Sequence, residues 1–233
     1  MNKVLYIILI SLFSLTIISC GEKEESTTDT TTTTTTSSPL FVAVGDNGTI
    51  LTSSDGTTWT SRTSGTTEYL RGGAYGNSTL VVVGASGTIL TSSDGTTWTS
   101  RTSGTSNLLG NVTYRNSTFM AIGNSGTILT SSDGITWTSI TSGTTNKVHS
   151  GTFGNNIFVT VGDNGTILTS SDAITWTAKT LGTTDKLNGI AYGNSTYVTV
   201  GDDGTIFSST DTNTWTSRTS GTSEHFRRVF YKE

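Results

Sequence analysis

Five tryptophans fall along this 233-residue chain at a constant interval of 39 residues: Trp59, Trp98, Trp137, Trp176 and Trp215. Each ends a near-identical phrase, of which VGDNGTILTSSDGTTW, residues 44–59, is the first copy. Self-similarity at a fixed period of about 40 residues is typical of repeat architectures, in which each repeat is one supersecondary unit. The period constrains the fold more than any other feature of the chain.

Within one period, runs of strand-forming residues alternate with short turns rich in Gly, Asn, Asp and Ser. In the fourth full copy we expect strands at 187–192, 197–200, 205–208 and 214–218. Turns this short join antiparallel neighbours, so each copy is predicted to be a four-stranded meander.

The second strand of each copy is apolar on both faces, as in FVAV at 41–44 and LVVV at 80–83. Such a strand has to be covered on both sides. Radially stacked sheets provide this cover, so the sequence predicts an all-β fold, a five-bladed β-propeller spanning residues 39–233. A β-solenoid or a β-sandwich would be the alternatives.

The two ends of this region carry different parts of one blade. The region begins at a second strand, residues 40–44, and ends with an extra first strand, residues 226–231. We therefore expect the N- and C-terminal strands to pair and close the ring, which would remove exposed sheet edges.

Two segments precede the propeller. Lys3 followed by a mainly apolar stretch at 4–18 is typical of an export signal, so residues 1–19 are predicted to be a signal peptide. Residues 21–38 contain no apolar side chain, and 30–36 are all threonine. Because such a composition cannot offset its ordering entropy, residues 20–38 are predicted to be a disordered tether.

The signal sequence ends in Ile-Ile-Ser-Cys at 17–20, which resembles the lipobox of bacterial lipoproteins. The resemblance implies lipidation of Cys20 and attachment to a membrane of the cell envelope, at the outer membrane or the cell surface. Cys20 is the single cysteine, so an internal disulfide is excluded. The net charge of −4, with no basic block, argues against nucleic-acid binding.

The phrase SSDGTTW at 53–59, called the Asp turn below together with its four equivalents, resembles the Asp-box (BNR-type) motif of sialidase-like propellers. It is one residue shorter between Asp and Trp than the usual motif. The whole unit looks like the repeat of photosystem II assembly and stability factor propellers. These resemblances imply the fold and leave the activity open, because such families share blades rather than chemistry.

The Asp turns contain an aspartate in every copy: Asp55, Asp94, Asp133, Asp172 and Asp211. We expect a structural role, in which the carboxylate accepts backbone N–H bonds from its own turn. The next residue is Gly in three copies but Ala173 and Thr212 in the others, which suggests that the position does not need a positive φ. The five tryptophans are expected to pack between blades.

The copies differ on one face, formed by the crossovers between blades and the turns after the second strands. At the start of the innermost strands, equivalent positions include Arg71, His149, Asn188 and Arg227. The adjoining turns carry Asp46, Asp163 and Asp202. These seven residues are the candidate ligand or partner face; ordinary surface drift is the alternative explanation.

No catalytic residues, metal ligands or cofactor are predicted. Outside the tether the glutamates are only Glu68, Glu224 and Glu233, and no paired carboxylates flank an expected pocket. The sequence favours a monomeric, non-enzymatic binding module for a protein or glycan partner. A structural scaffold or assembly factor is the alternative, and a sialidase-like glycoside hydrolase is less well supported.

Overall fold

The computed structural model describes residues 40–179 and 181–232. The chain divides into two compact units, Met1–Thr36 and Ser37–Glu233, and the described residues all belong to the second. The predicted signal peptide, the tether and Cys20 lie outside the described residues.

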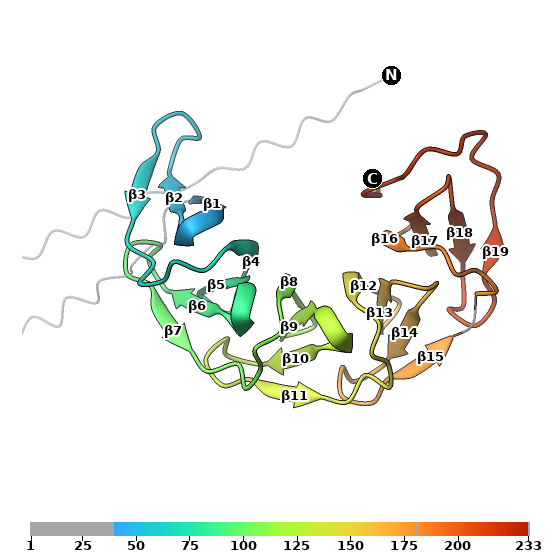
Figure 1. Ribbon diagram of the computed structural model, residues 1–233, viewed down its shortest axis with the longest axis horizontal. Coiled ribbons are helices and arrows are strands. Elements are labelled where there is room, and N and C mark those ends of the chain that lie inside the picture. Colours follow the sequence, from blue (N-terminus) through green and yellow to red (C-terminus); the bar gives the residue numbers. More distant parts are fainter. Residues whose placement is uncertain (1–39, 180, 233) are drawn as a thin grey trace, which may run out of the picture. The chain divides into compact units, whose positions relative to one another are not determined.

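Five antiparallel sheets make up the described unit, and within each sheet the strands follow one another in chain order (Figure 1). Blade 1 contains β1 (Phe41–Val44), β2 (Ile50–Ser53) and β3 (Thr60–Arg62). Blade 2 contains β4 (Leu70–Gly76), β5 (Thr79–Gly84), β6 (Ile89–Ser92) and β7 (Thr99–Arg101). Blade 3 contains β8 (Leu109–Arg115), β9 (Thr118–Gly123), β10 (Ile128–Ser131) and β11 (Thr138–Ile140).

Blade 4 contains β12 (Val148–Gly154), β13 (Ile157–Gly162), β14 (Ile167–Ser170) and β15 (Thr177–Lys179). Blade 5 contains β16 (Leu187–Gly193), β17 (Thr196–Gly201), β18 (Ile206–Ser209) and β19 (Thr216–Ser217). The strands β4, β8, β12 and β16 lie innermost and contact one another in that order, so the blades are arranged radially along an arc. The predicted fold class, a five-bladed β-propeller, is confirmed.

The hydrophobic core lies between neighbouring sheets rather than within any one of them. Between blades 2 and 3, for example, Val81 and Val83 of β5 pack with Leu109 of β8 and Phe119 of β9, and all four are fully buried. Similar clusters join blades 1 and 2, blades 3 and 4, and blades 4 and 5. Blades 2, 3 and 4 are covered on both faces this way, which is why their second strands are mainly apolar.

The tryptophans lie at the outer edge of these clusters. Trp98, Trp137, Trp176 and Trp215 each pack against the cluster between their own blade and the preceding one. Trp59 belongs to blade 1 and is 41% exposed. Its exposure marks the joint between blades 5 and 1, the only blade joint at which the described residues form no such cluster.

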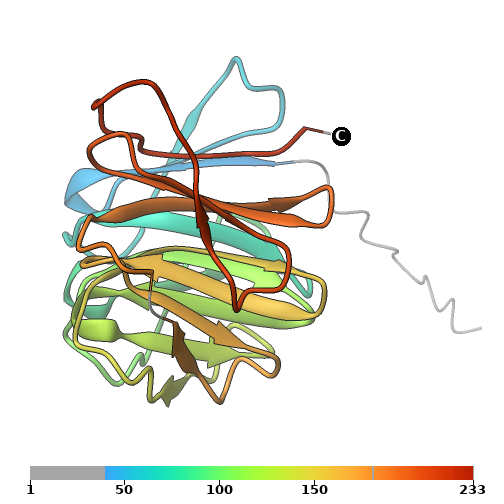
Figure 2. The same cartoon turned by 90° about the vertical axis from the view of Figure 1, so that its right-hand side faces the viewer.

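At that joint, the predicted closure by strand pairing is not formed. β1 pairs only with β2, blade 1 has three strands, and residues 226–231 form no strand among the described residues. Figure 2 superimposes the C-terminal segment on β1, but Figure 1 shows the two on opposite sides of the arc's opening.

The C-terminal segment is instead held on blade 5. The Phe226 N–H donates to the Gly201 carbonyl at 2.9 Å, just as the Leu70 N–H donates to the Gly45 carbonyl at 3.0 Å at the joint between blades 1 and 2. The Tyr231 ring packs directly on Gly193, as the Tyr192 ring does on Gly154. Residues 226–231 thus occupy the place of an innermost strand, while packing at the four formed joints keeps β1 beyond their reach.

Candidate functional site

The Asp turns form a rigid, self-contained hydrogen-bonded unit. In the third copy the Asp133 Oδ1 accepts the N–H groups of Ile135 and Thr136 at 2.8 and 2.9 Å. The Ser131 hydroxyl donates to the same oxygen at 2.9 Å. Trp137 Nε1 then donates to the Gly134 carbonyl at 2.8 Å. The other four copies repeat these bonds.

Backbone N–H donors stabilise the charged form of these carboxylates. They lower the pKa of Asp133, and they lower the pKa of Asp172 to about 2. The carboxylates are therefore ionised, and Oδ1 of each is held by hydrogen bonds from its own turn.

The inference that the following position needs no positive φ is wrong. Gly134 has a φ of 75°, but Ala173 and Thr212 also have positive φ values, of 61° and 62°. The hydrogen bonds of the turn impose this conformation whatever the residue, and a side chain with a Cβ is strained there.

A second site lies at the channel mouth, which we define as the cavity at the beginning of the innermost strands. It measures about 200 Å³ and is lined by Arg71, Gly110, Lys147, Val148, His149, Lys186, Asn188, Arg227 and Arg228. The four predicted face residues Arg71, His149, Asn188 and Arg227 are thus brought together, each from a different blade or from the C-terminal segment. Lys147, Lys186 and Arg228 were not among the predicted site residues.

Positive charge is concentrated at this mouth. Five of the chain's 13 lysines and arginines line it, although the net charge of the chain is −4. Burial lowers the pKa of Lys147, and the nearby positive charges of Arg71 and Lys186 lower it further. Because like charges crowd a partly desolvated cavity, an anion that enters it relieves their repulsion.

His149 is the most enclosed charged or titratable group of the mouth, with 12% of its side chain exposed. Its Nε2 lies 2.7 Å from Oδ1 of Asp163. Burial lowers the pKa of His149, and the Asp163 carboxylate partly opposes this effect. The pair therefore anchors β12 to the adjoining turn.

The three predicted aspartates of the face differ in their surroundings. Asp163 contacts His149, and Asp202 accepts a hydrogen bond from Asn188 Nδ2 at 2.8 Å. Asp202 also lies 4.0 Å from Arg227 Nη1. Asp46, on blade 1, is exposed and does not line the cavity. The structure therefore brings two of the three to the rim of the mouth.

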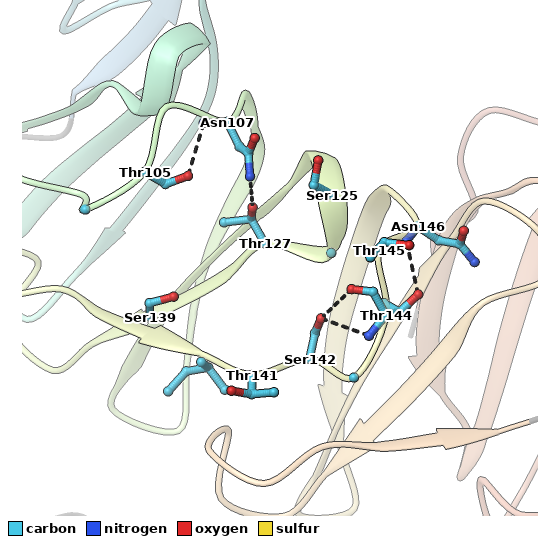
Figure 3. Close-up of a pocket in the computed structure, with 14 residues that line it drawn as sticks. Thr105, Asn107, Ser125, Thr127, Ser139, Thr141, Ser142, Thr144, Thr145 and Asn146 are labelled. Atoms are coloured by element: carbon cyan, nitrogen blue, oxygen red, sulfur yellow. Dashed lines mark hydrogen bonds between the residues drawn. The ribbon is translucent and has the colours of Figure 1, made fainter.

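A larger hollow lies elsewhere, in a groove of about 780 Å³ that blade 3 forms beside its crossovers (Figure 3). It is lined by hydroxyl, amide and backbone groups and contains no charged side chain. Grooves of about 420 and 520 Å³ occur at repeat-equivalent places around blades 2 and 5. Their recurrence with the period identifies them as a consequence of blade packing, so we place the candidate site at the channel mouth.

Two further findings concern the part of the chain that the structure describes. It contains no group of three His, Cys, Asp or Glu side chains placed to hold a metal ion. Over residues 40–179 and 181–232, no helix has the length and apolar character needed to cross a membrane.

No protein-family model matches the chain, and no curated protein matches it. Among solved structures, "YCF48 bound to D1 peptide" is similar with a TM-score of 0.62 and 19% identity, over 78% of this chain and 64% of that one. YCF48 from Cyanidioschyzon merolae gives a TM-score of 0.58 and 17% identity, over 76% and 66%.

The chain thus spans about two thirds of the length of these YCF48 structures. At such identities the likeness concerns the fold. It matches the resemblance to photosystem II assembly-factor propellers inferred from the repeat, and it leaves the Asp-box sialidase resemblance untested.

Proposed function

We propose that this protein is a non-catalytic interaction scaffold whose channel mouth holds an acidic segment of a protein partner. The observation that carries the proposal is the concentration of Arg71, Lys147, Lys186 and Arg228 in one cavity of an acidic protein. Asp163 and Asp202 bring two negative charges to the rim against the five Lys and Arg side chains that line the cavity, so the cavity keeps an excess of positive charge.

The size of the cavity fits part of a chain rather than a folded surface. A volume of about 200 Å³ admits one or two carboxylate side chains or a chain terminus. Arg and Lys donors bind carboxylates by charge-assisted hydrogen bonds, which are stronger where water is partly excluded. An extended acidic segment satisfies both conditions.

A polypeptide suits the mouth better than a glycan. None of the residues that line the cavity is Phe, Tyr or Trp, the side chains that most often stack on a sugar ring. The similar YCF48 structure is described as bound to a peptide, which supports the same class of ligand. A neutral glycan remains the second candidate and is an outcome of the test below.

Attachment to a membrane is part of the proposal and rests on the sequence alone. Lipidation of Cys20 in the bacterial cell envelope would leave the propeller on a threonine-rich tether, from which the mouth can reach a partner. Replacing Cys20→Ser should move the protein from the membrane fraction to the soluble fraction, whereas an unchanged distribution would contradict lipid anchoring.

The proposed function is tested by titrating the full chain with a fluorescent oligoglutamate peptide. The double variant Lys147→Gln/Lys186→Gln should bind about thirtyfold more weakly, because two lost contacts of roughly 1 kcal/mol each add up to about 2 kcal/mol. A matched control, Arg115→Gln/Lys179→Gln, removes the same charge away from the cavity and should bind like the unchanged protein.

Equal losses in both double variants would mean that only the overall charge attracts the peptide, and the proposed site would be wrong. Binding of an uncharged oligosaccharide that the Lys147→Gln/Lys186→Gln variant retains would instead favour the glycan.

A further inference from the structure

The two ends of the arc carry complementary halves of one blade. Among the residues that the structure describes, blade 1 has no innermost strand, and Phe41 on its open strand β1 is 55% exposed. At the other end, residues 226–231 occupy an innermost position on blade 5 without a sheet of their own. Phe230 and Tyr231 in this segment are 88% and 50% exposed.

The aromatic side chains at these ends match a pair that blades 3, 4 and 5 form. In blade 3, Tyr114 of the innermost strand and Phe119 of the second strand have ring centroids 4.5 Å apart. Equivalent pairs lie at 4.5 Å in blade 4 and 4.6 Å in blade 5. One period further on, the same two positions are Tyr231 and Phe41.

The charges match in the same register. His149 of β12 contacts Asp163 in blade 4, and Asn188 of β16 contacts Asp202 in blade 5. The equivalent positions at the open joint hold Arg227 on the segment and Asp46 on blade 1. A strand 226–231 placed beside β1 would therefore form an ion pair where blades 4 and 5 form hydrogen bonds.

The open joint also offers the groups for a backbone hydrogen bond that the complete blades form. In each of blades 2 to 5 the residue after the second strand donates its N–H to the carbonyl of the residue before the innermost strand, as from Ala85 to Tyr69 at 2.8 Å. At the open joint the equivalent groups are the Asp46 N–H and the His225 carbonyl, which are not paired with each other.

Within one molecule these halves are held apart. Asn188 Nδ2 donates to the Phe226 carbonyl at 2.8 Å, and Tyr231 packs on Gly193, so the segment is fixed to blade 5. Blade 1 is fixed to blade 2 by the cluster that contains Ile50 and Leu70. Closing the arc would require changing the packing at joints that are already filled.

We propose that residues 226–231 of one copy pair with β1 of a second copy and complete its first blade. The contact joins two different surfaces, so it is head to tail and can extend to further copies. It covers an otherwise open sheet edge and its exposed aromatic rings. This assembly replaces the monomer expected from the sequence, and it does not depend on the proposed function.

Cysteine cross-linking distinguishes pairing between two copies from closure of the ring within one molecule. In full chains that carry Cys20→Ser, Phe41→Cys is introduced in one chain and Tyr231→Cys in another. Opposite residues of antiparallel strands come close enough for a disulfide. The oxidised mixture should give a cross-linked dimer, and neither chain alone should do so.

The control replaces Tyr231→Cys by Tyr75→Cys, which is 57% exposed and occupies the equivalent position of blade 2. It should not cross-link to Phe41→Cys. A single chain that carries both Phe41→Cys and Tyr231→Cys should form a ladder of oligomers. If that chain yields only an internally bridged monomer, its own segment covers β1 and the proposal is overturned.

A charge swap provides a second measurement. By light scattering over a concentration series, Arg227→Asp should raise the concentration needed for self-association about tenfold or more, because it opposes two carboxylates. Adding Asp46→Arg should restore association. An unchanged protein that stays monomeric throughout, or a swap that restores nothing, would contradict the head-to-tail contact.

Discussion

The Asp turns and the residues at the channel mouth both recur once in every repeat. The Asp turns keep nearly the same sequence from blade to blade, whereas the mouth residues change. Each Asp turn repeats the same side chain and the same three hydrogen bonds to Oδ1 of its carboxylate, all of them from its own turn. At the mouth, the equivalent position changes from Arg71 to Gly110, His149, Asn188 and Arg227. There the charges of Arg71, Lys147 and Lys186 face one another.

This difference separates framework from recognition. A residue that recurs in every repeat has a structural role in the blade. A charged residue that does not recur, and that is partly buried among like charges, lowers stability and is a candidate for binding a ligand of opposite charge. Changes in the framework should therefore lower stability strongly, and changes at the mouth should alter binding with little effect on stability.

The largest loss of stability is expected from the periodic core. Phe119 is fully buried between blades 2 and 3, with the Tyr114 ring centroid at 4.5 Å and the Trp137 ring centroid at 6.4 Å. Phe119→Ala should lower the free energy of unfolding by about 3–5 kcal/mol, because it leaves a cavity between two sheets. Urea denaturation followed by tryptophan fluorescence measures this. A loss below ~1 kcal/mol would mean that the blades do not depend on one another.

A smaller loss is expected from an Asp turn. Asp133→Ala removes the acceptor of two backbone N–H groups and one hydroxyl, so we expect a loss of about 1–2 kcal/mol at pH 7. Glu224→Ala, an exposed carboxylate on the opposite face, is the control and should change little.

The effect of Asp133 should also depend on pH. Its pKa is lower in the folded state than the ordinary value near 4 in the unfolded chain. The stabilisation is therefore complete above pH ~4 and is lost as the pH falls through the lower folded-state pKa. Denaturation at pH 6 and pH 2 should show the difference between Asp133→Ala and the unchanged protein shrinking; a constant difference would contradict the role of the charge.

The sequence was sufficient for this framework but not for the mouth or the ring. The 39-residue period and the doubly apolar second strands specify five radially packed sheets, and the recurring aspartate indicates a turn. Lys147 and Lys186 precede their strands on variable crossovers, so their convergence depends on how blades 2, 4 and 5 are placed in space. A strand pattern does not predict that placement.

The open joint was missed for a related reason. Repeat positions identify Tyr231 with Phe41 as possible partners, but whether they meet depends on the angle between successive blades. That angle is set by side-chain packing in the four clusters between sheets. The positive φ values at Ala173 and Thr212 were not predicted, because the absence of glycine was read as the absence of a positive φ. The hydrogen bonds of the turn impose this backbone conformation on any residue.

A modest gain in stability is expected from replacing Thr212, whose backbone conformation is unfavourable for a β-branched residue. Thr212 is a β-branched residue with a φ of 62°, where glycine is favoured. Thr212→Gly should raise the free energy of unfolding by about 0.5 kcal/mol, since relief of strain outweighs the added chain entropy of glycine. The reverse change, Gly134→Thr, should destabilise, because its Cβ would come within 3.0 Å of Val81. Thermal unfolding of both variants measures the two effects, and a loss in Thr212→Gly would show that the turn is not strained.

The smallest change in stability is expected at the mouth. Lys147→Met keeps the apolar stem and removes a charge that burial, Arg71 and Lys186 all disfavour, so unfolding should become harder by no more than ~0.5 kcal/mol. The gain should shrink in high salt, which screens the repulsion, while affinity for oligoglutamate falls. Lys179→Met, whose ammonium donates to Asn213 outside the mouth, should show neither effect. If Lys147→Met instead lowered stability, Lys147 would have a stabilising partner within the fold. The mouth would then have a structural role, like the Asp turns, and would not be an anion-binding site.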